Sequence, residues 1–217
     1  MTSALIRIVD DDPQVAASLR FFLEVSGFTV LAYPSAEDFL RYDNLQQWGA
    51  LLLDVRMPTM SGLELQNQLL AQRALLPIVF LSAHADVSMA VEAVRKGASG
   101  FVEKPPQSEI LLDELTKAVQ LHEKRLKLSH ELESINQQLA LLTPAEKETA
   151  QLIAKGLSNS EIAAILSLSE NTVRRRRTDI ASKLDAHNAV EVSDLFRWKE
   201  QLEAQLLAPI KEEDFAL

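Results

Sequence analysis

Four charged residues stand where short apolar runs of the chain come to an end. They are, in chain order, Asp10, Asp11, Asp54 and Lys104. In an open parallel sheet all strands finish at one edge, so residues far apart in sequence converge there. Neighbouring carboxylates raise each other's pKa unless a cation compensates their charge. We therefore expect an acidic pocket with one built-in cation. The alternative is that each aspartate only caps the helix after it.

The elements that position these residues follow from hydrophobic periodicity. Five short β-type runs alternate with segments whose apolar residues recur at helical spacing. This alternation predicts an α/β domain over residues 1–120, with a doubly wound, five-stranded parallel sheet covered by helices on both faces. The expected strands are 5–9, 28–32, 50–53, 78–81 and 100–103.

A long linker helix with a heptad seam is expected over residues 121–142. Arg125 interrupts the seam at one core position. A heptad pattern favours a coiled coil with a second copy of the chain, but it also fits one amphipathic helix packed on its own domain. The apolar positions of the seam are Leu121, Leu128, Leu132, Ile135, Leu139 and Leu142.

Residues 143–207 indicate an all-α domain of four helices, followed by a tail at 208–217. Thr143 and Pro144 have the residue types of a helix start. Two helices, near 159–166 and at 170–184, are joined by a short turn, which is typical of a helix-turn-helix. The final helix, near 188–207, offers Leu202 as another candidate for self-association.

Composition narrows the class of protein. The net charge of −9 argues against indiscriminate binding of nucleic acid. Four consecutive arginines, 174–177, instead predict one defined contact element. The chain has no cysteine, which excludes disulfides and thiolate metal sites. The N-terminus lacks the pattern of a signal peptide, and no apolar run approaches the roughly 20 residues of a membrane span. We expect a soluble cytoplasmic protein with no membrane partner.

The motifs together resemble those of two-component response regulators of the NarL/FixJ class. The resemblance covers nearly the whole chain and implies a receiver domain with flavodoxin-like strand order, joined to a LuxR/GerE-type helix-turn-helix domain. The receiver motifs are VDDD at 9–12, LDVRMPTMSG at 53–62, LSA at 81–83 and FVEKP at 101–105. The helix-turn-helix motifs are LTPAE at 142–146, GLSNSEIA at 156–163 and SENTVR at 169–174.

The resemblance implies that Asp54 accepts a phosphoryl group from a sensor histidine kinase, with Mg²⁺ as the cofactor. Asp10, Asp11, Asp54 and the backbone carbonyl of Arg56 would form the oxygen-rich metal site. Lys104 would supply positive charge to the phosphoryl oxygens.

A switch is implied beside this site. The Ser82 hydroxyl would bond the phosphate while the Phe101 ring turns inward, and Arg56 and His84 would tune the lifetime of the acyl phosphate. Considered singly, Ser82 also fits a helix cap, Phe101 a core residue and His84 an exposed polar residue.

For the second domain, the resemblance implies that the helix at 170–184 binds operator DNA. Arg174, Arg175 and Thr178 would reach base edges, where an arginine pairs well with guanine. Relatives commonly carry a small apolar residue at position 175, so a distinctive and G·C-richer operator is expected. The alternative is a solvated helix face neutralised by acidic neighbours. Expected phosphate contacts are Arg177, Lys155 and Ser158.

The implied partners are the kinase, double-stranded operator DNA, a second copy of the phosphorylated chain and RNA polymerase. Two other classes of protein remain open from the residues. One is a phosphohydrolase, which would usually need a second aspartate where Arg56 stands. The other is a signalling module whose last helices bind protein, against which the arginine run argues.

Overall fold

The computed structural model describes residues 3–83 and 92–207. These residues form two compact units, one that ends at Leu126 and one that begins at Lys127. His84, which the sequence assigns to tuning the phosphoryl lifetime, and the tail at 208–217 lie outside the described residues. Within the described ranges, no helix combines the length and apolar character that crossing a membrane requires.

The first unit is built on a parallel sheet with the strand order β2-β1-β3-β4-β5. The expected strands and the flavodoxin-like order are confirmed, and each strand end lies within one residue of its predicted position. All residues of β1, β3 and β4 are buried, as expected for strands covered on both faces. The strands are β1 (Leu5–Val9), β2 (Thr29–Tyr33), β3 (Gly49–Asp54), β4 (Ile78–Ser82) and β5 (Gly100–Glu103).

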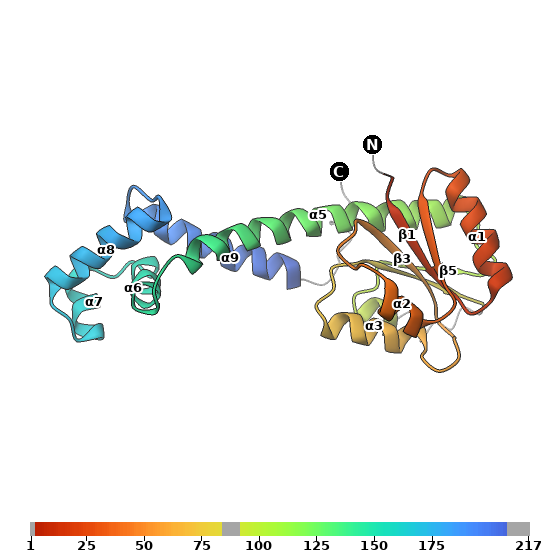
Figure 1. Ribbon diagram of the computed structural model, residues 1–217, viewed down its shortest axis with the longest axis horizontal. Helices are drawn as coiled ribbons and strands as arrows, with labels where there is room; N and C mark the ends of the chain where they lie inside the picture. Colours follow the sequence, from red (N-terminus) through yellow and green to blue (C-terminus); the bar gives the residue numbers. More distant parts are fainter. Residues whose placement is uncertain (1–2, 84–91, 208–217) are drawn as a thin grey trace. The chain divides into compact units, whose positions relative to one another are not determined.

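Helices cover both faces of this sheet (Figure 1). One apolar core lies between the sheet, α1 (Pro13–Val25) and the first part of α5 (Ser108–Ala140). The other lies between the sheet, α2 (Ala36–Tyr42), α3 (Gly62–Ala71) and residues 93–98. The C-terminal ends of β1 and β3, which carry the three aspartates, lie between these layers.

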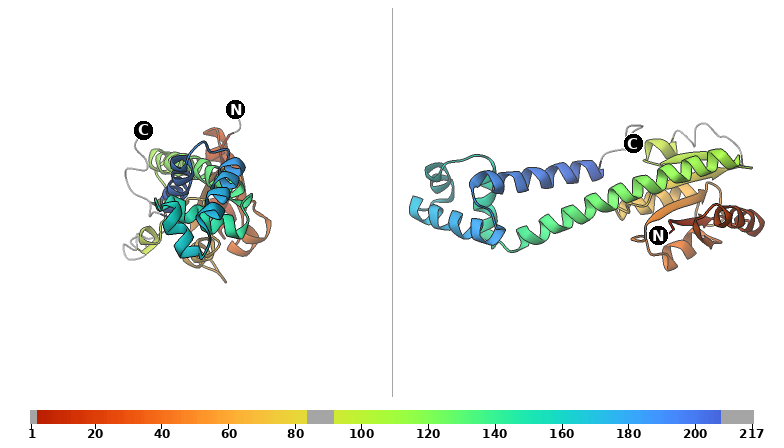
Figure 2. Two further views of the ribbon diagram at one scale, coloured as in Figure 1. Left: turned by 90° about the vertical axis from the view of Figure 1, so that its left-hand side faces the viewer. Right: turned by 90° about the horizontal axis from the view of Figure 1, so that it is seen from above.

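Helix α5 is one unbroken helix in Figure 2 and runs through the expected domain boundary at residue 120. Three contacts join it to the edge of the sheet opposite the aspartates. Trp48 Nε1 donates to the Val119 carbonyl at 3.1 Å, and His122 Nδ1 lies 3.1 Å from the Gly49 backbone nitrogen. Arg125 Nη1 donates to the Leu75 carbonyl at 3.4 Å. The boundary between the compact units accordingly falls after residue 126 rather than at 120.

The heptad seam is used inside the chain. Ile135, Leu139 and Leu142 are buried in the core of the second unit, and Leu128 and Leu132 pack against that core. Leu121 is buried within the first unit. In this structure the seam is therefore packed within the chain, as the amphipathic-helix interpretation predicts. An apolar stripe has the same sequence pattern whether its partner is the same chain or a second copy. Here each part of the stripe is covered by side chains of the unit in which it lies.

The second unit contains four further helices, as the sequence predicts. Thr143 caps α6 and forms a capping box with Glu146, and Gly156 adopts a φ of 79° just after that helix ends. Leu202, an expected contact between two chains, is buried in the core of this unit. The helices are α6 (Pro144–Ala154), α7 (Asn159–Leu166), α8 (Glu170–Leu184) and α9 (Ala189–Leu207).

Candidate functional site

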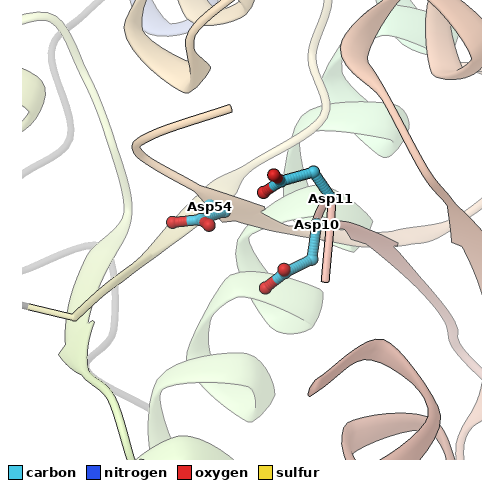
Figure 3. A group of neighbouring side chains, drawn as sticks. All are labelled: Asp10, Asp11 and Asp54. Atoms are coloured by element: carbon cyan, nitrogen blue, oxygen red, sulfur yellow. The ribbon is translucent and has the colours of Figure 1, made fainter. Parts of the chain in front are cut away.

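The three aspartates meet at the C-terminal edge of the sheet. Asp10 and Asp11 follow β1 and Asp54 ends β3, and these strands are hydrogen-bonded neighbours. One carboxylate oxygen from each aspartate lies within 4.8 Å of the others, and Figure 3 shows the three side chains grouped together. Asp10 and Asp54 are buried, whereas Asp11 is exposed. We call these three residues the acid cluster.

Lys104 supplies the cation that the sequence predicts for this pocket. Its Nζ lies 2.6 Å from Asp10 Oδ2 and 3.0 Å from Asp54 Oδ2. Burial alone would lower the pKa of Lys104, but the bonds to the two carboxylates outweigh it, so the pKa is raised and the ammonium stays charged. Burial raises the pKa of Asp10, and the bonds from Lys104 and from the Asp12 backbone oppose that shift. The peptide bond between Lys104 and Pro105 is cis.

The backbone around Asp54 holds its carboxylate in place. The Arg56 backbone nitrogen donates to Asp54 Oδ1 at 3.3 Å. The Gly62 nitrogen donates to the Val55 carbonyl at 3.0 Å and so closes the loop that follows β3. A Cβ atom at Gly62 would lie only 2.2 Å from the Asp54 carbonyl oxygen. Only glycine, which has no Cβ atom, fits this close approach.

The expected switch residues lie on the neighbouring strands. Ser82 ends β4 and is buried, and its carbonyl accepts a bond of 2.7 Å from the Lys104 backbone nitrogen. Phe101 lies on β5 opposite Phe80 and is half-buried against the core on the α3 side. The register of β4 and β5 places Ser82 and Lys104 at the same edge of the sheet as the acid cluster.

The arginine run on α8 divides into two pairs. Arg174 and Arg175 are exposed, whereas Arg176 and Arg177 are half-buried. Arg177 Nη2 donates to the Leu157 carbonyl at 2.6 Å, and Arg176 Nη1 lies 3.4 Å from Thr149 Oγ1. Two of the four arginines therefore contact their own domain, and the other two are available to a partner.

The exposed stripe of α8 continues on both sides of Arg174 and Arg175. Asn171 and Thr178 are exposed at helical spacing from them, while Val173 and Ile180 on the opposite side are buried. The sequence interpretation missed Asn171, although its spacing from the arginines could have found it. Lys155 and Ser158 are exposed near the start of α7, and Ser158 also caps that helix through Glu161.

Both units match known families. The description "Response regulator receiver domain" fits residues 6–116, and "Bacterial regulatory proteins, luxR family" fits residues 140–196. Nodulation protein W of Bradyrhizobium diazoefficiens is 33% identical over 93% of this chain and 87% of its own length. The transcriptional regulatory protein FixJ of the same organism is 32% identical over 88% of this chain and 93% of its own. The solved structure of the response regulator StyR is 37% identical, with a TM-score of 0.73 over 90% of this chain and 99% of that one.

The chain is a response regulator of the NarL/FixJ class. The response regulator is a transcriptional regulator whose activity depends on phosphorylation. Proteins with these two domains are regulators and not conventional enzymes, so the phosphohydrolase interpretation is wrong. Its receiver domain implies a sensor kinase as a partner, and its LuxR-type domain implies binding to DNA. The alternative of a C-terminal module that binds protein instead of DNA is therefore wrong as well.

The response regulator also contains a buried charge cluster that the sequence interpretation missed. Arg7, fully buried on β1, donates from Nε to the Asp43 carboxylate at 3.1 Å. Its Nη2 donates to the carbonyls of Asn44 and Gln47, each at 2.9 Å, and the Tyr33 hydroxyl donates to Asp43 at 2.8 Å. The cluster fixes the loop before β3 to β1. A lone arginine within an apolar run was the only sequence signal for it.

Proposed function

We propose that Asp54 accepts a phosphoryl group from a phosphohistidine of a sensor histidine kinase. The observation that carries this proposal is the position of the Asp54 carboxylate between two further carboxylates and the Lys104 ammonium. In the transfer, an Asp54 oxygen forms a bond to phosphorus while the phosphorus–nitrogen bond to the imidazole breaks. The imidazole leaves with a proton. Positioning and charge neutralisation dominate the barrier of such a step.

The acid cluster fits a hard divalent cation. Receiver domains bind Mg²⁺ through acidic residues, and the cluster offers oxygen ligands alone, which is the donor set that Mg²⁺ prefers. We assign Asp10, Asp11, Asp54 and the Arg56 backbone carbonyl as its ligands. Bound there, Mg²⁺ would add positive charge next to the phosphoryl oxygens.

The remaining residues of the receiver site have supporting roles in this proposal. The Lys104 ammonium, already bonded to Asp54, moves its bond to a phosphoryl oxygen. The Ser82 hydroxyl donates to another, and the half-buried Phe101 ring turns inward with it. Arg56, exposed two residues after Asp54, affects how fast water reaches the acyl phosphate, and we assign the same role to His84.

In the second domain, we infer that α8 enters the major groove of operator DNA. Support comes from the exposure of Arg174, Arg175 and Thr178 on one face of this helix. An arginine donates two hydrogen bonds to guanine, which favours an operator with guanine under Arg174 and Arg175. Lys155 and Ser158 contact phosphates, which position the helix without reading sequence.

The phosphorylated chain is proposed to bind DNA as a homodimer and to act together with RNA polymerase. Because the seam on α5 is buried within the chain, α9 is the better surface for self-association. Two large apolar side chains of α9, Val190 and Trp198, are 64% and 54% exposed. An exposed apolar face of this kind commonly marks an interaction surface.

One experiment tests both halves of the proposal. Full-length protein is incubated with acetyl phosphate and Mg²⁺, its intact mass is measured, and the same samples select duplexes from a randomised DNA library. We expect the wild type to gain the mass of one phosphoryl group and to enrich one family of duplexes more strongly once phosphorylated. Asp54→Ala should gain no mass.

Asp12→Asn is the matched control, because Asp12 caps α1 from outside the acid cluster and asparagine is an equally good cap. It should be phosphorylated as the wild type is. A gain of the same mass by Asp54→Ala would overturn the phosphoacceptor assignment. Selection of the same duplexes by Arg174→Ala combined with Arg175→Ala would overturn the assignment of α8.

A further inference from the structure

Arg177 contacts a turn of its own domain that lies between two helices. Its acceptor, the Leu157 carbonyl, comes directly after Gly156, where α6 has ended, and directly before Ser158, the N-cap of α7. The bond, at 2.6 Å, therefore ties α8 to the point at which the chain turns from α6 into α7.

The bond itself is partly buried, and two single atoms of the residues at this turn are fully so. Arg177 Nε and Asn159 Oδ1 are both buried side-chain atoms without a hydrogen-bond partner within residues 3–83 and 92–207. The first is a donor and the second an acceptor, and Asn159 lies only two residues after Leu157. The guanidinium thus has its Nε withdrawn from solvent and one Nη bonded inward. This charge-assisted bond holds the guanidinium against its own domain, so that at most its remaining Nη donors could contact a DNA phosphate.

Other cationic side chains of α8 contact a different neighbour. Lys183 Nζ lies 2.6 Å from Glu146 Oε2, and Arg176 lies 3.4 Å from Thr149. Both of those partners belong to α6. The bond of Arg177 is directed instead to the residue next to the N-cap of α7. In a helix-turn-helix, the angle between its two helices determines how the second one lies in the groove.

We propose that Arg177 is a positioning residue for DNA recognition and not a phosphate contact. Its bond to Leu157 sets α8 against α7, so that Arg174 and Arg175 face the bases. The inference rests on the DNA binding proposed above and replaces the role that the sequence predicts for Arg177.

The test separates positioning from phosphate contact by the salt dependence of binding. The probe is a fluorescently labelled duplex that the full-length wild type has selected, titrated at several KCl concentrations. The binding constant falls as salt rises, and each lost phosphate contact makes the slope of log K against log salt shallower by about 0.9. The variants are Arg177→Met, which removes all donors, and Arg177→Gln, which keeps an uncharged amide donor. Arg175→Met is the control from the exposed pair.

We expect Arg177→Met to weaken binding about tenfold with an unchanged slope, because one charge-assisted bond inside the domain is lost. Arg177→Gln should recover most of that affinity, also at the wild-type slope. Arg175→Met should weaken binding to the selected duplex more than to an unrelated one. Two results would overturn the inference. One is a slope for Arg177→Gln that is shallower by the amount expected for one lost phosphate contact. The other is an unchanged affinity for Arg177→Met.

Hydrogen–deuterium exchange of residues 155–160, measured without DNA, reports on the same contact. Arg177→Met should exchange faster there than the wild type, and Arg175→Met should not. Equal exchange in all three proteins would refute the contact itself. If the wild type enriched no duplex, the DNA-binding proposal would fail and the positioning role with it, while exchange would still show whether Arg177 holds the turn.

Discussion

At Asp54, the proposed phosphoacceptor, the backbone leaves no room for a side chain at Gly62. A methyl group there would lie 2.2 Å from the Asp54 carbonyl oxygen, which is a backbone atom that cannot move alone. We predict that Gly62→Ala displaces Asp54, slows phosphorylation by acetyl phosphate and lowers the free energy of unfolding by about 1 to 3 kcal/mol. Intact mass against time and urea denaturation measure the two effects.

Gly100→Ala is the matched control for this prediction. A Cβ at Gly100 would also meet an oxygen at 2.2 Å, but that oxygen belongs to the flexible side chain of Glu114. The carboxylate can turn away, so this variant should phosphorylate at the wild-type rate with a smaller loss of stability. Equal losses of rate in both variants would show that the approach of Gly62 to Asp54 has no special effect on the site.

Single residues also mark the limit of what the sequence predicts. The charge of Lys104 at the end of a strand was sufficient to place it among the aspartates, because parallel strands end at one edge. The sequence could assign Arg174 to base edges and Arg177 to a phosphate, but it could not reveal that Arg177 bonds within its own domain. Its acceptor, the Leu157 carbonyl, is brought close by the turn between α6 and α7, which the spacing of the arginines does not record.

At the scale of the element, helix α5 is joined to the sheet by a buried histidine. His122 lies next to Gly49 at the start of β3, and burial, together with the positive charges of Arg7 and Arg125, lowers its pKa to about 4. The unfolded chain takes up a proton near pH 6.5, whereas the folded chain does so only near pH 4. We predict that the free energy of unfolding of the first unit falls as pH drops from 6.5 to 4, by up to about 1.4 kcal/mol per pH unit.

Urea denaturation followed by Trp48 fluorescence in a Trp198→Phe background measures this slope. The chain has two tryptophans, and Trp48 reports on the first unit through its bond to Val119 in α5. His122→Gln should reduce the slope between pH 6.5 and 4, whereas His130→Gln, which changes an exposed histidine on the same helix, should leave it intact. A slope unchanged by His122→Gln would assign the pH dependence to the carboxylates instead.

Elements were predicted well where their pattern has a single solution. Alternating apolar runs and helical segments admit one arrangement, a parallel sheet covered on both faces, and strand ends were predicted to within one residue. The seam on α5 admits two arrangements, since an apolar stripe does not record whether its partner belongs to the same chain. Leu139 and Ile135 pack in the core of their own unit, which the spacing of the residues alone could not reveal.

At the scale of the whole molecule, the apolar cores are divided between the two units. The first unit holds one core on each face of its sheet, and the core of the second unit joins the end of α5 to α6–α9. No cysteine cross-links the chain. Each unit therefore has its own source of stability, and a substitution in one core should act mainly on the unfolding of that unit.

Leu139→Ala tests both this independence and the use of the seam. Leu139 is 8% exposed in the third core, so truncation should lower the stability of the second unit by about 2 to 5 kcal/mol. Calorimetry of the unphosphorylated protein should show one transition shifted by Leu139→Ala and another shifted by Leu52→Ala, which opens the core beneath α1. Because the seam is filled within one chain, the midpoint of the second unit should not depend on protein concentration. A midpoint that rose with concentration would show that the seam pairs between two copies, since association makes stability depend on concentration.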